Sequence, residues 1–112
     1  MLNLSNRYFL PIKVDNLALY LSSAAFAPAN FYENRTRDVQ SLFENCILLS
    51  FSHLVGDADC SVALILTDEE CKRLEKLDNE NTCFLYEGFL PASRLENVCF
   101  LSKEDEEHNR TA

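Results

Sequence analysis

The apolar positions of the chain are concentrated in residues 46–66, where two nearly continuous runs flank a short polar stretch. Residues 47–55 and 62–66 are both rich in strand-forming side chains. Continuous apolar runs are typical of strands that are covered on both faces. Residues 56–59 contain a glycine and two aspartates, which favour turns. The pattern therefore predicts a buried central hairpin over residues 47–66.

Apolar and polar side chains alternate over residues 8–14, and this period of two predicts a strand. Pro11 falls inside it and has no backbone N–H to donate to a neighbour. Proline within sheets is confined to edge strands and bulges. We therefore expect the first strand to lie at a sheet edge or to carry a bulge.

Apolar residues recur at helical spacing in three segments, each opened by a residue type that commonly caps helices. The segments begin at Asp15, Asp38 and Thr67 and end near Phe26, Cys46 and Leu77. In the third segment, Thr67 and Glu70 have the spacing of a capping box, in which two side chains bond the backbone reciprocally. The sequence thus predicts three helices.

Strand-forming residues return over 83–90, where Gly88 marks a bulge or bend, and over 98–101 after a turn at 91–93. The predicted order is β-α-α-β-β-α-β-β, a small α+β domain with a mainly antiparallel sheet. We expect this single domain to span residues 1–101. Residues 102–112 are acidic and carry no apolar side chain before Ala112, so they are expected to form a mobile tail.

The net charge of the chain limits the classes of molecule that it is expected to bind. The 112 residues contain 18 acidic and 10 lysine or arginine side chains, a net charge of −8. Such a surface repels phosphate backbones, so direct nucleic-acid binding is disfavoured. Acidity serves solubility in the simplest interpretation. Mimicry of a nucleic acid, to inhibit an enzyme that binds one, is the alternative.

The five cysteines are scattered and include no C-x-x-C pair. An odd number of thiols among apolar neighbours indicates reduced cysteine rather than a disulfide framework. The chain has neither a secretory signal pattern nor an apolar run of membrane-spanning length. We therefore expect a cytoplasmic protein with no membrane contact.

Metal and cofactor sites find little support in the sequence. His53, Asp57, Asp59 and Cys60 are all zinc-ligand types near the predicted turn, but their spacing matches no known zinc pattern. With only two glycines in the chain, a glycine-rich phosphate loop is excluded. The sequence predicts no metal, no cofactor and no preassembled catalytic centre.

One segment has the composition of a binding surface, because it combines aromatic, amide and guanidinium groups. The candidate residues are Phe31, Tyr32, Arg35, Arg37, Asp38 and Gln40. Arginine beside aromatic residues is typical of interface hot spots. The alternative is a solvated loop whose arginines pair with Glu33 and Asp38.

Three features together resemble bacterial toxin or defence proteins with an ADP-ribosyltransferase-like core. They are the first strand, the Asp15-Asn16-Leu17 sequence that opens a helix, and a late Pro91-x-Ser93-x-Leu95-x-x-Val98 pattern. No catalytic glutamate or nicotinamide-binding motif aligns, so the resemblance assigns no site residue.

The leading hypothesis from the sequence is a non-enzymatic interaction or regulatory domain of a bacterial protein. It would bind another protein or a copy of itself through a sheet edge or the 31–40 segment, either alone or as the N-terminal module of a longer chain. One alternative is the acidic inhibitor described above. The other is a fragment of a toxin or defence enzyme whose catalytic residues lie elsewhere.

Overall fold

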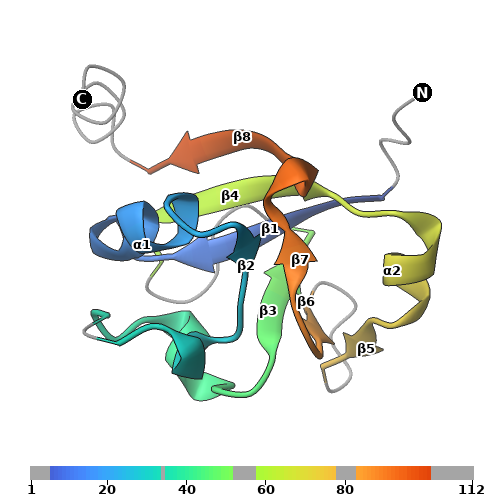
Figure 1. Cartoon of the computed structure of the whole chain (residues 1–112), viewed down its shortest axis with the longest axis horizontal. Coiled ribbons are helices and arrows are strands. Elements are labelled where there is room, and N and C mark those ends of the chain that lie inside the picture. Colours follow the sequence, from blue (N-terminus) through green and yellow to red (C-terminus); the bar gives the residue numbers. More distant parts are fainter. Residues whose placement is uncertain (1–5, 34, 52–57, 78–82, 102–112) are drawn as a thin grey trace.

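A six-stranded antiparallel sheet organises the computed structural model, which describes residues 6–33, 35–51, 58–77 and 83–101 (Figure 1). The strands follow the order β5-β6-β3-β1-β4-β8 across the sheet. Their bounds are Arg7–Ile12 for β1, Ile47–Ser50 for β3, Cys60–Ile65 for β4, Glu75–Lys76 for β5, Cys83–Tyr86 for β6 and Leu95–Phe100 for β8. A second, two-stranded sheet pairs β2 (Ala25–Phe26) with β7 (Leu90–Pro91).

The helical elements are all short. Figure 1 shows the two α-helices at opposite ends of the molecule. They are α1 (Leu17–Leu21) and α2 (Asp68–Lys72), and the 3-10 turns are η2 (Val14–Asn16), η3 (Ala29–Phe31), η4 (Val39–Leu42) and η5 (Ala92–Arg94). The described residues form a small compact domain with mixed helix and strand content and a mostly antiparallel sheet, as predicted. None of their helices is long and apolar enough to cross a membrane.

The predicted central hairpin over residues 47–66 is wrong. Both of its runs are buried strands, β3 and β4, but β1 lies between them and pairs antiparallel with each. The two strands are therefore parallel to one another. Apolar patterning identifies buried strands correctly, but it does not distinguish two strands that pair directly from two that flank a third.

The predicted edge position of the first strand is also wrong, because β1 is central and contains Pro11. Phe9 pairs with Ser50 in β3, so Pro11 would next pair with Leu48. The Gln40 side chain stands between them instead. Its amide donates to the carbonyls of Pro11 (3.0 Å) and Leu48 (2.8 Å) and accepts from the Leu48 N–H (2.9 Å).

The second predicted helix, over residues 38–46, is replaced by η4. Asp38 caps this turn as expected, with a side-chain oxygen that accepts from the Gln40 N–H. The helix does not continue because Gln40 turns its side chain into the sheet and the Glu44 carbonyl accepts from the Asn30 N–H at 3.1 Å. The order therefore differs from the prediction, with two α-helices in the described residues instead of three.

The other predicted helices form but are shorter than expected. α1 ends at Leu21, and Asp15 is not its cap, since Asn16 occupies the N-cap position, although its side chain forms no capping hydrogen bond to the helix. In α2 the predicted capping box is confirmed: the Thr67 hydroxyl accepts from the Glu70 N–H, and the Glu70 carboxylate accepts from the Thr67 N–H. Gly88 adopts a φ of 114°, which confirms the predicted bend.

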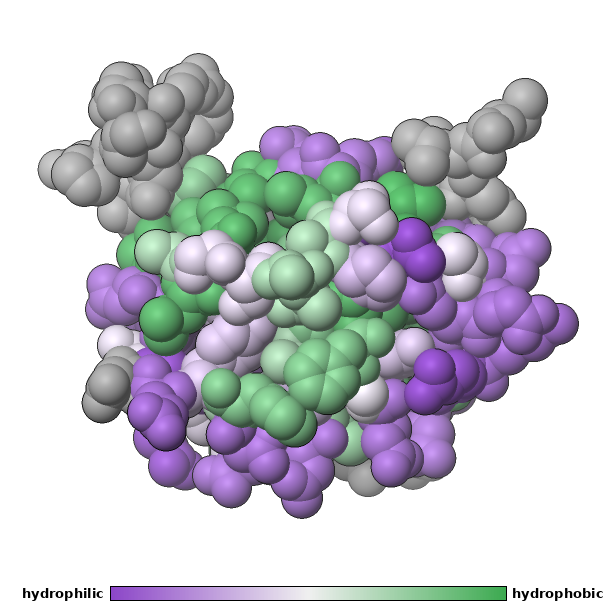
Figure 2. Space-filling model, viewed as in Figure 1, coloured by the Kyte–Doolittle hydropathy of each residue, from purple (hydrophilic) through white to green (hydrophobic). Residues whose placement is uncertain are grey.

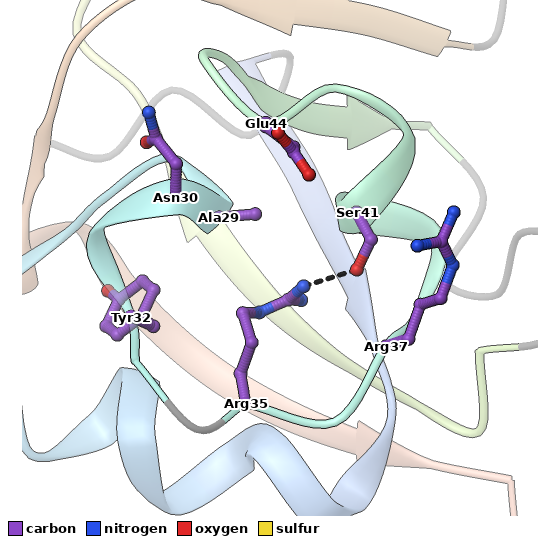
Figure 3. A pocket seen from close by; sticks show the side chains of 7 residues that line it. All are labelled: Ala29, Asn30, Tyr32, Arg35, Arg37, Ser41 and Glu44. Atoms are coloured by element: carbon purple, nitrogen blue, oxygen red, sulfur yellow. Dashed lines mark hydrogen bonds between the residues drawn. The ribbon is translucent and has the colours of Figure 1, made fainter.

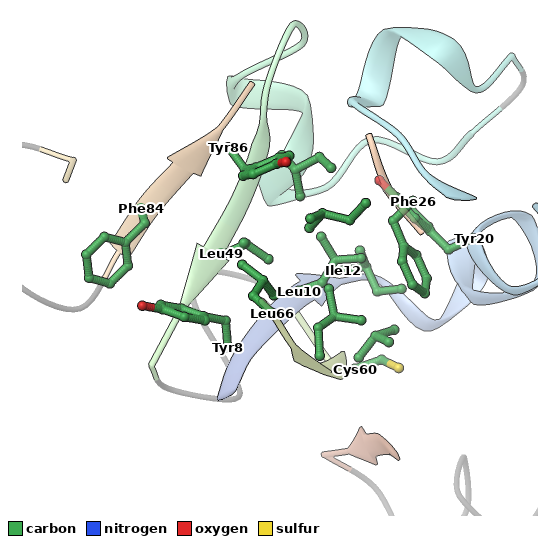
Figure 4. Packing of buried hydrophobic residues seen from close by; sticks show 14 of the residues in the cluster. Tyr8, Leu10, Ile12, Tyr20, Phe26, Leu49, Cys60, Leu66, Phe84 and Tyr86 are labelled. Carbon is green, nitrogen blue, oxygen red and sulfur yellow. The ribbon is translucent and has the colours of Figure 1, made fainter. Parts of the chain in front are cut away.

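The main core lies against the six-stranded sheet (Figure 4). Its centre is formed by fully buried aliphatic side chains of β1, β3 and β4, and Tyr20, Phe26 and Tyr86 pack around them. Figure 2 shows apolar side chains near the middle of the visible face and hydrophilic ones around its lower rim. The exposed aromatic residues include Phe31 and Phe89, whose rings are 4.6 Å apart.

Candidate functional site

A pocket of about 300 Å³ lies between η3, η4 and the loop that joins them (Figure 3). It is lined by Ala29, Asn30, Tyr32, Arg35, Arg37, Ser41 and Glu44. Figure 3 shows Arg35 and Glu44 reaching toward the middle from opposite sides, with Tyr32 and Asn30 on one flank and Arg37 on the other. Such a volume is at the lower end of the range for small-molecule sites.

The wall of the pocket is built on a buried ion pair. The Arg35 guanidinium binds the Asp38 carboxylate and the Ser41 hydroxyl, and the Arg35 and Asp38 side chains are 9% and 0% exposed. The attraction within a buried charge pair offsets the cost of desolvation only when the geometry is good and further hydrogen bonds are present. Asp38 has those bonds, because it also accepts from the backbone N–H groups of Gln40 (2.9 Å) and Lys13 (3.1 Å).

Asn16 fixes the wall to the beginning of α1. Its side-chain amide donates to Asp38 Oδ2 at 2.8 Å and to the Thr36 carbonyl at 2.6 Å, and its oxygen accepts from the Thr36 N–H at 2.7 Å. Asn16 is only 1% exposed. Thr36 and Asp38, which precede η4, are therefore held to the turn before α1 by side-chain hydrogen bonds of Asn16.

Two buried polar atoms beside the pocket have no hydrogen-bond partner among the described residues. They are the Tyr20 hydroxyl and Arg35 Nε. Burial raises the pKa of the Tyr20 phenol well above its usual range, although the positive charge of Arg35 opposes this rise. The Tyr20 ring contacts Tyr32, with ring centroids 4.5 Å apart. Buried groups without partners are uncommon in proteins. The Tyr20 hydroxyl and the Arg35 guanidinium lie close enough to interact with one another, so a small adjustment of either side chain would pair them.

Arg37 and Glu44 supply exposed charges of opposite sign at the pocket mouth. In the part of the chain that the structure describes, neither forms an ion pair. A guanidinium presents planar donors that suit phosphate, and a carboxylate accepts from hydroxyls. The mouth can therefore bind a ligand that carries both phosphate and sugar groups.

The residues proposed from the sequence have three different roles. Tyr32, Arg35 and Arg37 line the pocket, while Asp38 and Gln40 are buried beneath it. Phe31 is exposed, is not among the lining residues, and packs against Phe89. The solvated-loop alternative anticipated the Arg35–Asp38 pair but not its burial.

Sequence reasoning missed four lining residues: Ala29, Asn30, Ser41 and Glu44. Ser41 carried a usable signal, because it lies three residues after the capping Asp38 and completes a capping box with it. Asn30 and Glu44 are brought together by the backbone bond between η3 and the end of η4, which no local pattern indicates.

The proposed zinc-ligand types do not assemble within the described residues. Asp59 accepts from the Val14 N–H at 2.6 Å, and Cys60 is buried in the main core. His53 and Asp57 lie outside the described residues. No group of three metal-ligating side chains occurs in the ranges that the structure describes.

A comparison with protein families finds one that matches residues 7–111, the 2-component system ADP-ribosyltransferase domain. No curated protein matches the chain. The matched range covers nearly the whole sequence, and the family is one of enzymes. This finding contradicts the expectation of a non-enzymatic domain, and it favours the alternative of an enzyme of the toxin or defence type.

Proposed function

Because the chain belongs to the 2-component system ADP-ribosyltransferase domain family, we propose that the pocket between η3 and η4 binds NAD⁺ as the donor for ADP-ribosyl transfer. In this reaction a nucleophile on the acceptor forms a bond to C1′ of the nicotinamide ribose. The bond from C1′ to the nicotinamide nitrogen breaks, its electron pair leaves with nicotinamide, and the acceptor loses a proton to solvent or a base.

The observation that carries the proposal is the exposed guanidinium of Arg37 at the mouth of a polar pocket, where it forms no ion pair with any residue that the structure describes. A pyrophosphate is the part of NAD⁺ with the most negative charge, and arginine binds it through two parallel N–H groups. Arg35 also lines the pocket, but its positive charge is balanced by Asp38, so Arg37 supplies the free positive charge among the lining residues. With a volume of about 300 Å³ the pocket suits one half of the dinucleotide rather than all of it.

Glu44 is the acidic residue among the pocket lining. Cleavage of a glycosidic bond passes through an oxocarbenium-like transition state, in which positive charge develops on the sugar ring. A carboxylate placed near the ribose stabilises that charge more than it stabilises the neutral sugar. We therefore assign Glu44 the electrostatic role and the ribose hydroxyls as its hydrogen-bond donors.

Tyr32 has a supporting role in this scheme. Its hydroxyl accepts from the Ala27 N–H at 3.1 Å and lies 3.4 Å from the Ala25 carbonyl, which fixes the ring at the side of the pocket. A fixed aromatic ring offers a flat surface for nicotinamide or adenine. Because its hydroxyl is already bonded, Tyr32 is not assigned a part in proton transfer.

Binding is tested by calorimetric titration of the full chain with NAD⁺ and with ADP-ribose. Loss of an arginine–phosphate contact is worth about 1.5–3 kcal/mol, so Arg37→Ala should weaken binding at least tenfold. Lys72→Ala is the matched control, because Lys72 is an exposed cation on α2 and does not line the pocket. Equal affinities of Arg37→Ala and the wild-type chain would refute the assignment of the pocket.

Catalysis is tested separately by measuring release of nicotinamide from NAD⁺. Glu44→Gln keeps the size and hydrogen-bonding capacity of the side chain but removes its charge. We expect it to bind NAD⁺ with little change and to release nicotinamide at least a hundredfold more slowly, as expected for loss of a group that stabilises the transition state. Wild-type rates in this variant would contradict the role of Glu44 and leave the binding site standing.

A further inference from the structure

The outer edge of the large sheet is formed by β8, the last strand in the order, which pairs with β4 on its inner side. Within the described residues, no strand pairs with its other side. Proteins commonly protect such edges with proline, lysine or inward-pointing charges. β8 has neither proline nor lysine, and its single charge, Glu96, is paired with Arg7 at 2.8 Å. A β-bulge at Glu96 also protects the beginning of this edge, and the part after Glu96 is competent to accept another strand.

The register of β8 determines which of its backbone groups face outward. Ser61 pairs with Cys99 and Ala63 with Asn97, and the Leu101 N–H donates to the Asp59 carbonyl at 3.0 Å. In an antiparallel ladder, alternate residues direct their N–H and C=O groups to opposite sides. Residues 97, 99 and 101 thus face β4, and Val98 and Phe100 face outward.

The regular part of this edge is short. A register shift lies between Ala63 and Leu64, so that Leu64 pairs with Leu95 and Glu96 is the additional residue. Bulges bend a strand and interrupt its ladder. The straight portion begins after Glu96, and Val98 and Phe100 are the two positions there that can bond a new neighbour.

We propose that a second copy of this chain pairs with β8 in antiparallel orientation, about a twofold axis at Cys99. This register places Val98 opposite Phe100 of the second copy and Phe100 opposite its Val98. Each pair exchanges two backbone hydrogen bonds, about four in all. If the twofold axis lay at Val98 or at Phe100 instead, only one hydrogen-bonded pair would remain within the straight portion. The axis at Cys99 therefore gives the largest number of backbone hydrogen bonds.

The side chains agree with this register. Val98 and Phe100 are half-buried at the border of the main core, and a β-branched residue opposite an aromatic one is a favourable cross-strand pair. In this register Glu96 is not opposite Glu96 of the second copy, so no like charges of the two β8 strands are directly opposed. Each chain still carries a net charge of −8, and the repulsion between copies should weaken the dimer at low salt.

Substitution at Val98 tests the pairing on the full chain. Proline at this position removes an outward N–H and leaves the bonds to β4 in place, whereas Val98→Thr keeps both the N–H and the branched shape. By sedimentation at high salt, the wild-type chain and Val98→Thr should be dimers and Val98→Pro a monomer, with unchanged circular dichroism. A wild-type chain that sediments as a monomer at its highest soluble concentration would overturn the proposal.

Cys99 provides a second test that does not depend on the proline variant remaining folded. In the proposed register the two Cys99 side chains form a non-hydrogen-bonded pair, in which side chains lie closest. A short thiol-to-thiol crosslinker should therefore join two copies through Cys99. Cys99→Ser should abolish the crosslinked band and Cys71→Ser should retain it. A band that persists in Cys99→Ser at wild-type intensity would reject the register, whatever the outcome of NAD⁺ binding.

Discussion

Gln40 supplies a connection that Pro11 cannot make. Proline has no N–H, so the Leu48 carbonyl would face an empty position in the ladder between β1 and β3. The Gln40 amide donates to that carbonyl and accepts from the Leu48 N–H, as a strand residue would. Gln40 is 1% exposed, and its side chain replaces a strand residue in the ladder although the residue itself belongs to η4.

Gln40→Leu tests this role. The substitution keeps the approximate volume but leaves the Leu48 N–H and two carbonyls buried without partners, and each such group costs about 1–3 kcal/mol. We expect the free energy of unfolding in urea to fall by about 3 kcal/mol or more. Asn97→Leu, the same kind of change at an exposed position, is the control. Equal midpoints for the two variants would show that the amide is dispensable.

Glu70, like Asp38, is a buried acidic residue whose carboxylate accepts several hydrogen bonds. Burial raises the pKa of its carboxyl, but the hydrogen bond from Arg94 at 2.8 Å and those from Thr67 outweigh this effect and hold the pKa below its usual range. A carboxyl with a lowered pKa in the folded state stabilises the fold above its unfolded pKa of about 4.3. That stabilisation is lost as the pH falls through the folded-state value.

Stability curves against pH test this effect. Between pH 7 and acid, the wild-type chain should lose stability from Glu70 titration, and Glu70→Gln should lose less over the same interval. Glu69→Gln, at an exposed neighbouring position on α2, is the matched control and should follow the wild-type curve. A Glu70→Gln curve with the wild-type slope at acid pH would contradict the pKa direction.

At the scale of single elements, local sequence rules succeeded where the interaction is local. The Thr67 capping box and the Asp38 cap were predicted because both partners lie within three residues. The extent of the helix after Asp38 was not, because Gln40 bonds to the sheet and the Glu44 carbonyl to Asn30, contacts that no window of sequence contains.

The Thr67 cap of α2 is expected to contribute measurably to the stability of the fold. α2 has only five residues, so most of its stability comes from its cap and its packing. Thr67→Ala removes one half of the box and should lower the free energy of unfolding by about 1 kcal/mol. Thr67→Ser retains the hydroxyl and should restore most of the loss. Denaturant titration of the three proteins measures both effects, and a Thr67→Ser chain no more stable than Thr67→Ala would argue against the cap.

Across the whole molecule, the central strand β1 precedes the other described strands in sequence, and its pairing partners lie far along the chain from it. β1 pairs with β4 from Arg7 with Ile65 to Ile12 with Cys60, and β4 in turn pairs with β8. Nearly all the sheet is therefore non-local in sequence. The α+β class, the buried strands and the mixed composition could be predicted from patterning, whereas strand order depends on these distant pairings.

Non-local pairing also sets an expectation for kinetics. Domains dominated by distant contacts refold in roughly milliseconds to seconds, because loop closure must precede the stabilising contacts. Stopped-flow refolding of the chain should fall in this range. A relaxation within microseconds would mean that the folding barrier does not include the pairing of β1 with β4.

Part of the pocket lining could be predicted from the sequence, because those residues lie close together along the chain. Tyr32, Arg35 and Arg37 lie within one loop, and their composition indicated a binding surface. Asn16 and Tyr20 were not anticipated as its supports, because they reach the loop from α1 and its preceding turn.

Gln40 and Asp38 are adjacent in sequence to the pocket lining. Gln40 donates to the Pro11 carbonyl in β1, and Asp38 accepts from the Lys13 N–H just before η2. Among the described residues, this part of the pocket wall is therefore bonded both to the sheet and to the turn before α1. The slowest amide protons of the chain should then include the Leu48 N–H beneath the pocket. If the proposed NAD⁺ site is correct, little of the binding free energy would be spent on ordering Asp38 and Gln40, which are already held in place.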